Sequence, residues 1–168
     1  LRGADQVAWI ARLTPEIDNL RAAQAWATDH HELDLALTVV VSLCVTGITI
    51  GMTALEWASS LATDPDIDTR PLGPTLLSWA VFRAAIGQPD MDHAAALEAR
   101  RSRAAAAFGL PPSPDGFRAQ ATIAQHFGTP AEVLDLTRHW VDVARAAGDH
   151  YETVQGLNVL ASVMASTD

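Results

Sequence analysis

The chain of 168 residues is the size of a single domain and is long enough to bury a hydrophobic core. All 11 basic residues are arginine, so the lysine of a P-loop and the lysine of a Schiff-base enzyme cannot lie within this sequence. The net charge of −9 disfavours direct contact with nucleic acid, because such binding depends on neutralising phosphates.

The sequence begins Leu1-Arg2-Gly3 without an initiator Met, and we expect residues 1–168 to be one helical-repeat domain of a longer polypeptide. Proline- and aspartate-containing stretches predict weak internal breaks near 63–74 and 109–116. Elsewhere apolar residues recur at helical spacing. Spacing and capping signals together predict helices near 4–13, 15–30, 33–46, 52–62, 73–86, 91–108, 116–127, 131–147 and 150–166.

The ends of these segments carry helix-capping residues. Thr129-Pro130-Ala131-Glu132 has the pattern of a capping box with proline at the first helical position, and Asp149 has the pattern of a cap for the last helix. Four glycines stand where a left-handed C-terminal cap favours glycine: Gly87, Gly109, Gly128 and Gly148. Two apolar stripes mark the last two helices: Val133, Leu136, Trp140, Ala144 and Ala147 in one, and Val154, Leu157, Ala161 and Met164 in the other.

The segment 35–55 contains no charged residue and therefore meets the length rule for a transmembrane helix. Its Thr, Ser and Gly content and its acidic flanks favour instead two buried helices with a break at Gly47 and Gly51. The Val and Thr content of 33–46 also suits a buried strand. We expect Cys44, the single cysteine, to be a small buried hydrophobic residue of this run.

The first helices of successive predicted pairs recur about every 40 residues, which is typical of stacked helical hairpins. The sequence therefore predicts an all-α fold of stacked antiparallel helical hairpins in a tetratricopeptide-like right-handed superhelix. Tryptophans are spread about one per repeat, and we expect them to fill the gaps between layers: Trp9, Trp26, Trp57, Trp79 and Trp140.

No arrangement of side chains in the sequence predicts a catalytic site. The cluster 29–34 holds two histidines and three carboxylates, but neighbouring helical residues point in different directions, so His30 and His31 disfavour one shared metal ion. His126 and His139 can meet across a hairpin, yet no acidic partner is evident. We therefore expect no catalytic, cofactor-binding or metal-binding residue, and no enzyme activity of the chain itself.

The densest basic run is Arg100-Arg101-Ser102-Arg103, which occupies one turn of a predicted helix. A charge run of this kind is typical of a solvated helix face. We expect Arg100, Arg101 and Arg103 to lie on such a face and to be a candidate partner surface.

The stretch 9–27, WIARLTPEIDNLRAAQAWA, resembles a segment of large bacterial regulators that reads W-L-x-x-L-x-x-E-x-D-N-L-R-A-A-L-x-W-A. These are the LuxR-type and related STAND-class ATPase regulators, and similar regions also follow class III nucleotide cyclase domains. Residues 33–37 and 56–62 resemble the two helices that come next in that family. The specific likeness thus covers roughly residues 9–62, with Gln24 in place of the usual leucine.

The resemblance implies a multidomain transcriptional or signalling regulator whose ATP site and DNA-reading helix lie outside these residues. Asp18, Asn19 and Arg21 would then be structural or would contact the NTPase domain. Our hypothesis is a cytoplasmic interaction or sensor module that binds other domains of the same polypeptide, or a protein or small effector in a concave groove, with no direct contact to nucleic acid or membrane. The alternatives are the regulatory arm of a nucleotide cyclase and a homodimerising scaffold.

Overall fold

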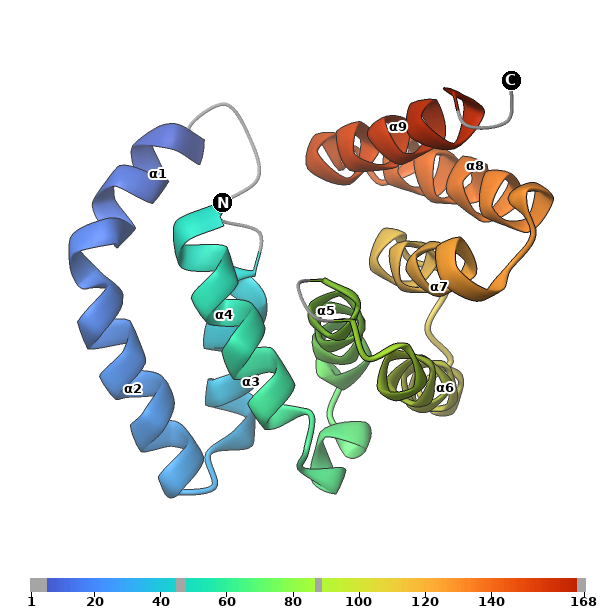
Figure 1. The fold of residues 1–168 in the computed structure, drawn as a ribbon. Helices are drawn as coiled ribbons and strands as arrows, with labels where there is room; N and C mark the ends of the chain where they lie inside the picture. The colour runs from blue at the N-terminus through green and yellow to red at the C-terminus, as the bar shows by residue number, and fades with distance from the viewer. Residues whose placement is uncertain (1–5, 45–47, 87–88, 166–168) are drawn as a thin grey trace.

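The computed structural model describes residues 6–44, 48–86 and 89–165, and within these ranges the chain is helical and contains no β-strand (Figure 1). Short 3-10 turns, η1 (Thr14–Glu16) and η2 (Pro65–Thr69), interrupt the series of α-helices. The α-helices are α1 (Gln6–Leu13), α2 (Ile17–Asp29), α3 (Leu33–Leu43), α4 (Ile48–Leu61), α5 (Gly73–Ala85), α6 (Met91–Ala107), α7 (Pro114–Phe127), α8 (Pro130–Ala146) and α9 (His150–Ala165). The predicted all-α class is confirmed.

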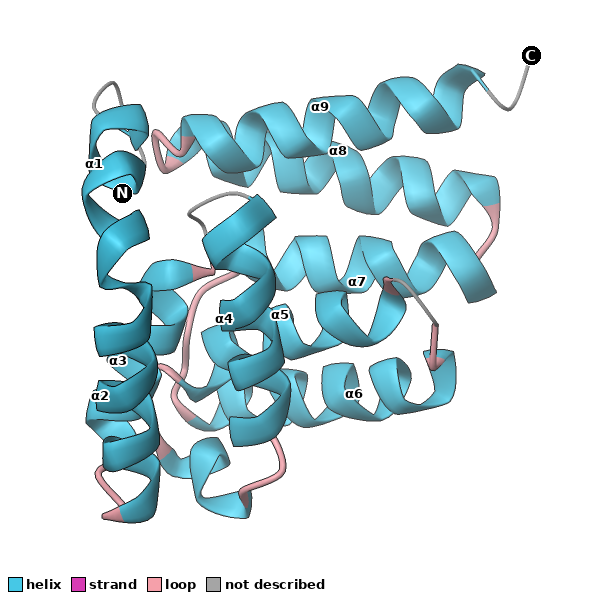
Figure 2. Ribbon diagram, turned by 60° about the vertical axis from the view of Figure 1, so that its left-hand side comes forward, coloured by secondary structure: helices cyan, strands magenta, loops and turns pink. Residues whose placement is uncertain are grey.

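From α2 to α9 each helix packs against the next one along the chain, which gives the layered arrangement in Figures 1 and 2. Alternate helices also touch, because α3 packs against α5, α5 against α7 and α7 against α9. Among the described elements, α1 makes substantial contact only with η1. The helices are therefore joined mainly through neighbours in sequence, as in a layered stack.

The charge-free segment divides into α3 and α4, so the prediction of two buried helices is confirmed and the strand alternative for 33–46 is wrong. Gly47 lies outside the described residues, and Gly51 lies within α4, so no break occurs at Gly51. A Cβ at Gly51 would lie 3.4 Å from the Cys44 carbonyl oxygen, which is ordinary van der Waals contact, so the packing does not require glycine at this position. Over the described ranges, each helix is too short or too polar to traverse a bilayer.

Helix starts follow the capping signals. The backbone N–H of Thr129 donates to Glu132 Oε2 at 2.7 Å, and the N–H of Glu132 donates to Thr129 Oγ1 at 3.3 Å, which confirms the capping box. Asp149 Oδ1 accepts from the N–H of Glu152 at 3.0 Å. Helix α7 begins at Pro114, earlier than predicted, because Ser113 Oγ accepts from the N–H of Gly116 at 3.1 Å.

The glycines at helix ends fall into two kinds. Gly109 and Gly148 have φ of +59° and +67°, so the predicted left-handed caps are confirmed at these two positions. Gly128 has φ −91°, and the prediction of a left-handed cap is wrong there. A Cβ at Gly128 would lie 2.8 Å from the carbonyl oxygen of Ala124, so close approach explains this glycine. Gly87 lies outside the described residues.

Hydrophobic packing is concentrated in α3, α4, α5 and α6, and a second, smaller cluster joins α7 to α8 through Ala121, Trp140 and Ala144. Trp79 and Trp140 are buried as predicted, and Trp57 is half-buried. The prediction of core packing is wrong for Trp9 and Trp26, which are 47% and 52% exposed. These two side chains lie on α1 and α2, at the end of the stack, where no following layer covers them in the described structure.

Candidate functional site

An open groove of about 660 Å³ lies where α5, α6 and α7 meet, and we call it the proline groove. The first residues of α5, the last turns of α6 and the loop leading into α7 form its walls. Its lining residues are Pro71, Pro74, Thr75, Arg101, Ser102, Ala105, Ala106, Leu110, Pro111, Pro112, Ser113, Gly116, Phe117 and Gln120. The wall is therefore mainly apolar, with a small number of polar groups, as is usual in binding sites.

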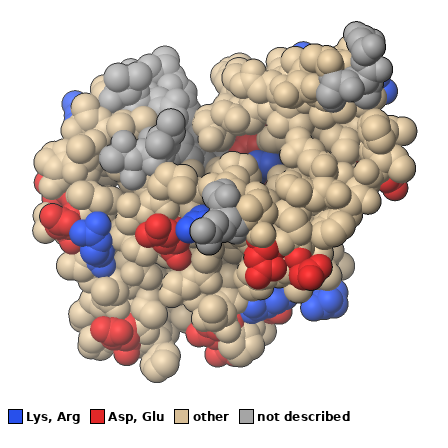
Figure 3. Space-filling view, viewed as in Figure 1, with Lys and Arg blue, Asp and Glu red and all other residues tan. Residues whose placement is uncertain are grey.

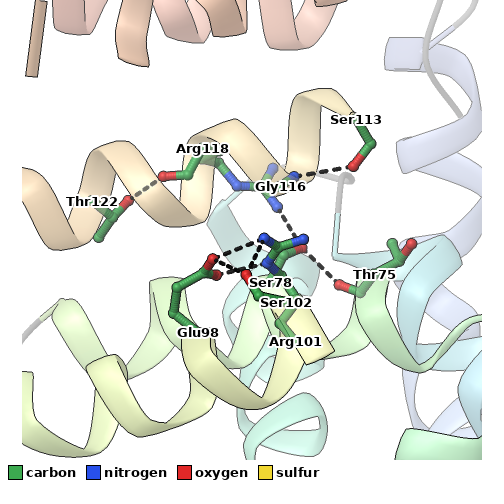
Figure 4. Close-up of polar contacts among 9 residues, drawn as sticks. All are labelled: Thr75, Ser78, Glu98, Arg101, Ser102, Ser113, Gly116, Arg118 and Thr122. Atoms are coloured by element: carbon green, nitrogen blue, oxygen red, sulfur yellow. Dashed lines mark hydrogen bonds and ion pairs between the residues drawn. The ribbon is translucent and has the colours of Figure 1, made fainter. Parts of the chain in front are cut away.

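Arg101 is the charged group of the proline groove, and it is only 8% exposed. Its Nε donates to Glu98 Oε2 at 2.6 Å, and its Nη2 donates to Glu98 Oε1 at 2.8 Å and to Ser102 Oγ at 3.0 Å (Figure 4). This bidentate pairing with the Glu98 carboxylate fixes the plane of the guanidinium group. The third nitrogen, Nη1, has no hydrogen-bond partner among the described residues.

The N-terminus of α7 lies beside this guanidinium group. A Cβ at Gly116 would lie 3.0 Å from Arg101 Nη1 and 3.3 Å from Ser113 Oγ, so any larger residue here would have to displace the end of the Arg101 side chain slightly. The first turn of α7 carries the positive end of the helix dipole, although Pro114 has no N–H and the N–H groups of Gly116 and Phe117 already donate to Ser113. Arg101, which is paired with Glu98, and the start of α7 thus lie together on one side of an apolar groove.

A second polar assembly, the Arg118 cluster, joins α5, α7, α8 and α9 and consists of Arg118, Glu152, Asp115, Ser78, Trp79 and Trp140. Arg118 forms ion pairs with Glu152 and, at 3.0 Å, with Asp115, although Arg118 and Glu152 are 4% and 0% exposed. Arg118 Nη2 donates to Ser78 Oγ at 3.3 Å, as Figure 4 shows. Trp140 Nε1 donates to Glu152 Oε2 at 3.0 Å, and the Arg118 guanidinium carbon lies 3.5 Å from the centre of the Trp79 ring.

A cavity of about 150 Å³ adjoins the Arg118 cluster between the end of α5, α7 and α9. On the face shown in Figure 3, the surface is hollowed between the α4–α5 side and the α8–α9 side, and acidic and basic atoms are visible in the hollow. Burial raises the pKa of the nearby Cys44 thiol to about 12, a rise that the charge of Arg118 partly offsets and that of Asp115 reinforces. Cys44 is buried as predicted and stays protonated at neutral pH, so it is not a ready nucleophile.

The prediction of a solvated arginine face is wrong for Arg101, which lines the proline groove, and for Arg100, which binds the preceding loop. Arg100 Nε donates to Asp68 Oδ1 at 2.6 Å, Nη2 donates to the Asp64 carbonyl oxygen at 2.6 Å, and Nη1 donates to the carbonyl oxygen of Ala62. Arg100 therefore holds the expected break at 63–74 against α6. Of the three arginines, Arg103 is exposed, and its partner role stays a prediction.

The predicted interdomain residues on α2 are exposed and make local contacts. Arg21 forms an ion pair with Asp18 one turn away, and Asn19 Nδ2 donates to Glu16 Oε2 at 2.7 Å. In the described structure the polar contacts of the Asn19 and Arg21 side chains lie within α2 and η1 and do not reach back to α1. Contact with an NTPase domain stays a prediction.

His30 and His139 each contact a backbone carbonyl of the preceding helical turn and stack on an aromatic ring. His30 Nδ1 lies 2.8 Å from the Trp26 carbonyl oxygen, and its ring stacks on the Trp26 ring with centroids 4.4 Å apart. His139 stacks on Phe117 with ring centroids 5.7 Å apart. In the part of the chain that the structure describes, no group of three or more His, Cys, Asp or Glu side chains is arranged to hold a metal ion.

The sequence analysis did not predict that Arg118 and Glu152 are buried and paired with each other. Both have a signal in the helical pattern, because Arg118 stands three residues before the buried Ala121, and Glu152 stands four residues before the buried Gly156. A charged residue in the register of the buried face predicts a partner inside the fold.

Comparison of the chain with known proteins does not assign it to a family. No protein-family model matches the chain, and comparisons with curated proteins and with solved structures give no significant match.

Proposed function

We propose that the chain is a protein-interaction module that binds an extended peptide segment in the proline groove. The observation that carries this proposal is a mainly apolar open groove with one buried guanidinium group whose Nη1 has no partner among the described residues. A segment with apolar side chains and a carboxylate matches this surface, because the carboxylate can accept from Arg101 Nη1 near the positive end of α7.

The groove is prepared for such a ligand in two respects. Four prolines line it, and their rings lose little conformational freedom when a ligand binds. Glu98 holds the Nε–Nη2 edge of Arg101, so the guanidinium group does not have to be reoriented to receive a second carboxylate at Nη1. Both features reduce the entropy lost on association.

The proposed segment comes from another domain of the same polypeptide or from a partner protein. We further propose that the stacked helices form a tetratricopeptide-like right-handed superhelix within a multidomain transcriptional or signalling regulator. Packing of successive and alternate helices supports the superhelix, and the likeness of residues 9–27 to LuxR-type and STAND-class regulators supports the regulatory role. Ligand binding would then bias an output domain through a coupling free energy between sites.

A fluorescence-anisotropy screen tests the binding function. The probes are short fluorescein-labelled apolar peptides in three matched sets, acidic, neutral and basic. We expect acidic members to bind with Kd on the order of 10–100 µM and to lose affinity when the carboxylate is replaced by an amide. Ala106→Trp, which places an indole in the groove from an exposed helix position, should weaken binding at least about tenfold, a change of about 1.4 kcal/mol.

Ala146→Trp is the matched control, because Ala146 is also an exposed helical alanine and does not line the groove. This variant should bind the peptides like the original chain. The proposal fails if no acidic peptide binds or if Ala106→Trp leaves the affinity unchanged while circular dichroism shows a folded protein.

A further inference from the structure

The cavity of about 150 Å³ beside the Arg118 cluster has walls from four helices, α5, α7, α8 and α9. Four aromatic side chains line it, Trp79, Phe82, Trp140 and Tyr151, and we call it the aromatic cavity. It is separate from the proline groove, because the two share no lining residue. An apolar cavity of about 150 Å³ is large enough to hold a six-membered aromatic ring such as benzene.

The aromatic walls are held in place by contacts with other side chains. The rings of Trp79 and Phe82 meet edge to face, with centroids 6.4 Å apart and planes at 85°. The Arg118 guanidinium group covers one face of the Trp79 ring, and Trp140 Nε1 donates to Glu152 Oε2. Trp79 and Trp140 are each only 3% exposed. An aromatic ligand therefore meets rings that are already ordered, which reduces the entropy lost on binding.

The charges beside the aromatic cavity favour an uncharged ligand. Arg118 is paired with two carboxylates, Glu152 and Asp115, so negative charge exceeds positive charge in this group. Together with the net charge of −9 on the chain, this arrangement repels an anion. A ligand cation is disfavoured as well, because the Arg118 guanidinium group already occupies one face of the Trp79 ring and would repel a second positive charge there.

Two glutamine amides supply hydrogen-bonding groups in the wall. Gln125 of α7 and Gln155 of α9 both line the aromatic cavity, and in the described structure neither side chain has a hydrogen-bond partner. Each amide offers an N–H donor and a carbonyl acceptor side by side. A ligand amide presents the complementary acceptor and donor, so it can bind a glutamine through two parallel hydrogen bonds. Gln155 is half-buried, so water competes less for its amide than for that of the exposed Gln125.

We propose that the aromatic cavity binds a small uncharged aromatic amide. The six-membered ring of the ligand lies against the aromatic walls, and its amide group pairs with Gln155, with Gln125 as a second partner on α7. The proposal does not depend on peptide binding in the proline groove, because the two sites are lined by different residues. For a ligand of about nine non-hydrogen atoms, we expect a Kd on the order of 0.1–1 mM.

Titration of the chain with benzamide, followed through the indole N–H signals in NMR spectra, tests this proposal. The signals of Trp79 and Trp140 should shift and saturate, because both rings line the cavity. Trp9 and Trp26, exposed on α1 and α2, are internal controls whose signals should stay in place. Benzoate has the same shape but carries a negative charge, so it should bind at least about tenfold more weakly than benzamide. This comparison uses the unaltered chain and does not depend on the folding of a variant.

Gln155→Leu removes the amide and keeps a side chain of similar size. It should raise the Kd for benzamide about threefold to tenfold, the loss expected for one or two hydrogen bonds. Asn158→Leu is the matched control, because Asn158 is an exposed amide on the same helix and does not line the cavity. This control should bind benzamide like the original chain. The proposal is overturned if benzamide at about 10 mM shifts neither buried indole signal, if benzoate binds as tightly as benzamide, or if the two variants bind equally well.

Discussion

Three arginines of this chain have partners inside the fold. Arg100 binds the loop before α5, Arg101 binds Glu98 at the floor of the proline groove, and Arg118 binds Glu152 beneath α9. A buried guanidinium group is stable only when acceptors replace the lost water. In each of the three cases a carboxylate supplies the main replacement, and Arg118 has two.

Removal of one member of the Arg118–Glu152 pair should strongly destabilise the fold. Glu152→Ala leaves the buried Arg118 with one fewer carboxylate and leaves Trp140 Nε1 without its acceptor. We expect the free energy of unfolding to fall by about 3–5 kcal/mol, the range found when one partner of a buried ion pair is removed. Urea denaturation followed by circular dichroism measures this loss.

The exposed pair of Arg21 and Asp18 is the matched control for that experiment. Asp18 is 83% exposed in its side chain, and Asp18→Ala should change the free energy of unfolding by less than about 1 kcal/mol. In a double-mutant cycle, Arg118→Met should cost less in the Glu152→Ala background than alone, because the arginine there has already lost its main partner. Equal losses in both backgrounds would show that the two residues contribute independently.

At the scale of single elements, the start of α8 depends on a carboxylate that titrates in acid. The hydrogen bond from the Thr129 backbone, followed by that from its hydroxyl, lowers the pKa of the exposed Glu132 carboxyl below its usual value of 4.5. The folded state thus binds the proton less readily than the unfolded state. The stabilisation by Glu132 is complete above the unfolded pKa and is lost as pH falls through the folded pKa.

Thermal melts of the original chain and Glu132→Ala at several pH values test this dependence. At neutral pH the original chain should have the higher Tm, since the variant lacks one half of the capping box. The difference in Tm should shrink as pH falls below about 4 and vanish once the carboxyl group is protonated. A difference that persists unchanged in strong acid would mean that the carboxylate charge is not what stabilises the helix start.

The helices were predictable because the residues that start and end each helix lie within a few positions of its ends. Thr129 with Glu132, and the glycines at 109 and 148, mark helix ends within a few residues, and the structure confirms these ends. The proline groove and the Arg118 cluster were not predictable in the same way. Arg118 and Glu152 are 34 residues apart, and Arg118 and Ser78 are 40 apart, so only the packing of four helices brings them together. Charge runs likewise give no information on burial, as Arg101 shows.

Trp26 on α2 and Val154 on α9 show the opposite error, since helical periodicity identifies an apolar face but not the layer that covers it. Helices α2 and α9 lie on opposite sides of the described stack, and both residues are more than half exposed. An inner helix such as α5 has neighbours on several sides and buries nearly all of its apolar residues. The number of neighbouring layers, and not the sequence pattern of the helix alone, decides burial.

Across the whole molecule, hydrophobic packing is uneven. The larger core joins α3 to α6, whereas Ala121, Trp140 and Ala144 form the small core between α7 and α8. The Arg118 cluster connects the two regions, because Ser78 and Trp79 belong to α5 and Glu152 belongs to α9. Ala119 of α7 belongs to the larger core and Tyr151 of α9 packs against it, so the C-terminal helices are joined to that core by apolar contacts as well as by the polar Arg118 cluster.

Hydrogen exchange measured by mass spectrometry should reveal this division. We expect the amides of α3 and α5 to exchange most slowly, those of α8 and α9 at intermediate rates, and those of α1 fastest, because α1 packs substantially only on η1 among the described elements. Glu152→Ala should accelerate exchange in α7, α8 and α9 and leave α3 and α4 nearly unchanged, since the larger core keeps its contacts. If the variant instead accelerates exchange equally in every helix, the chain opens as one cooperative unit, and the Arg118 cluster stabilises the whole stack instead of its C-terminal part.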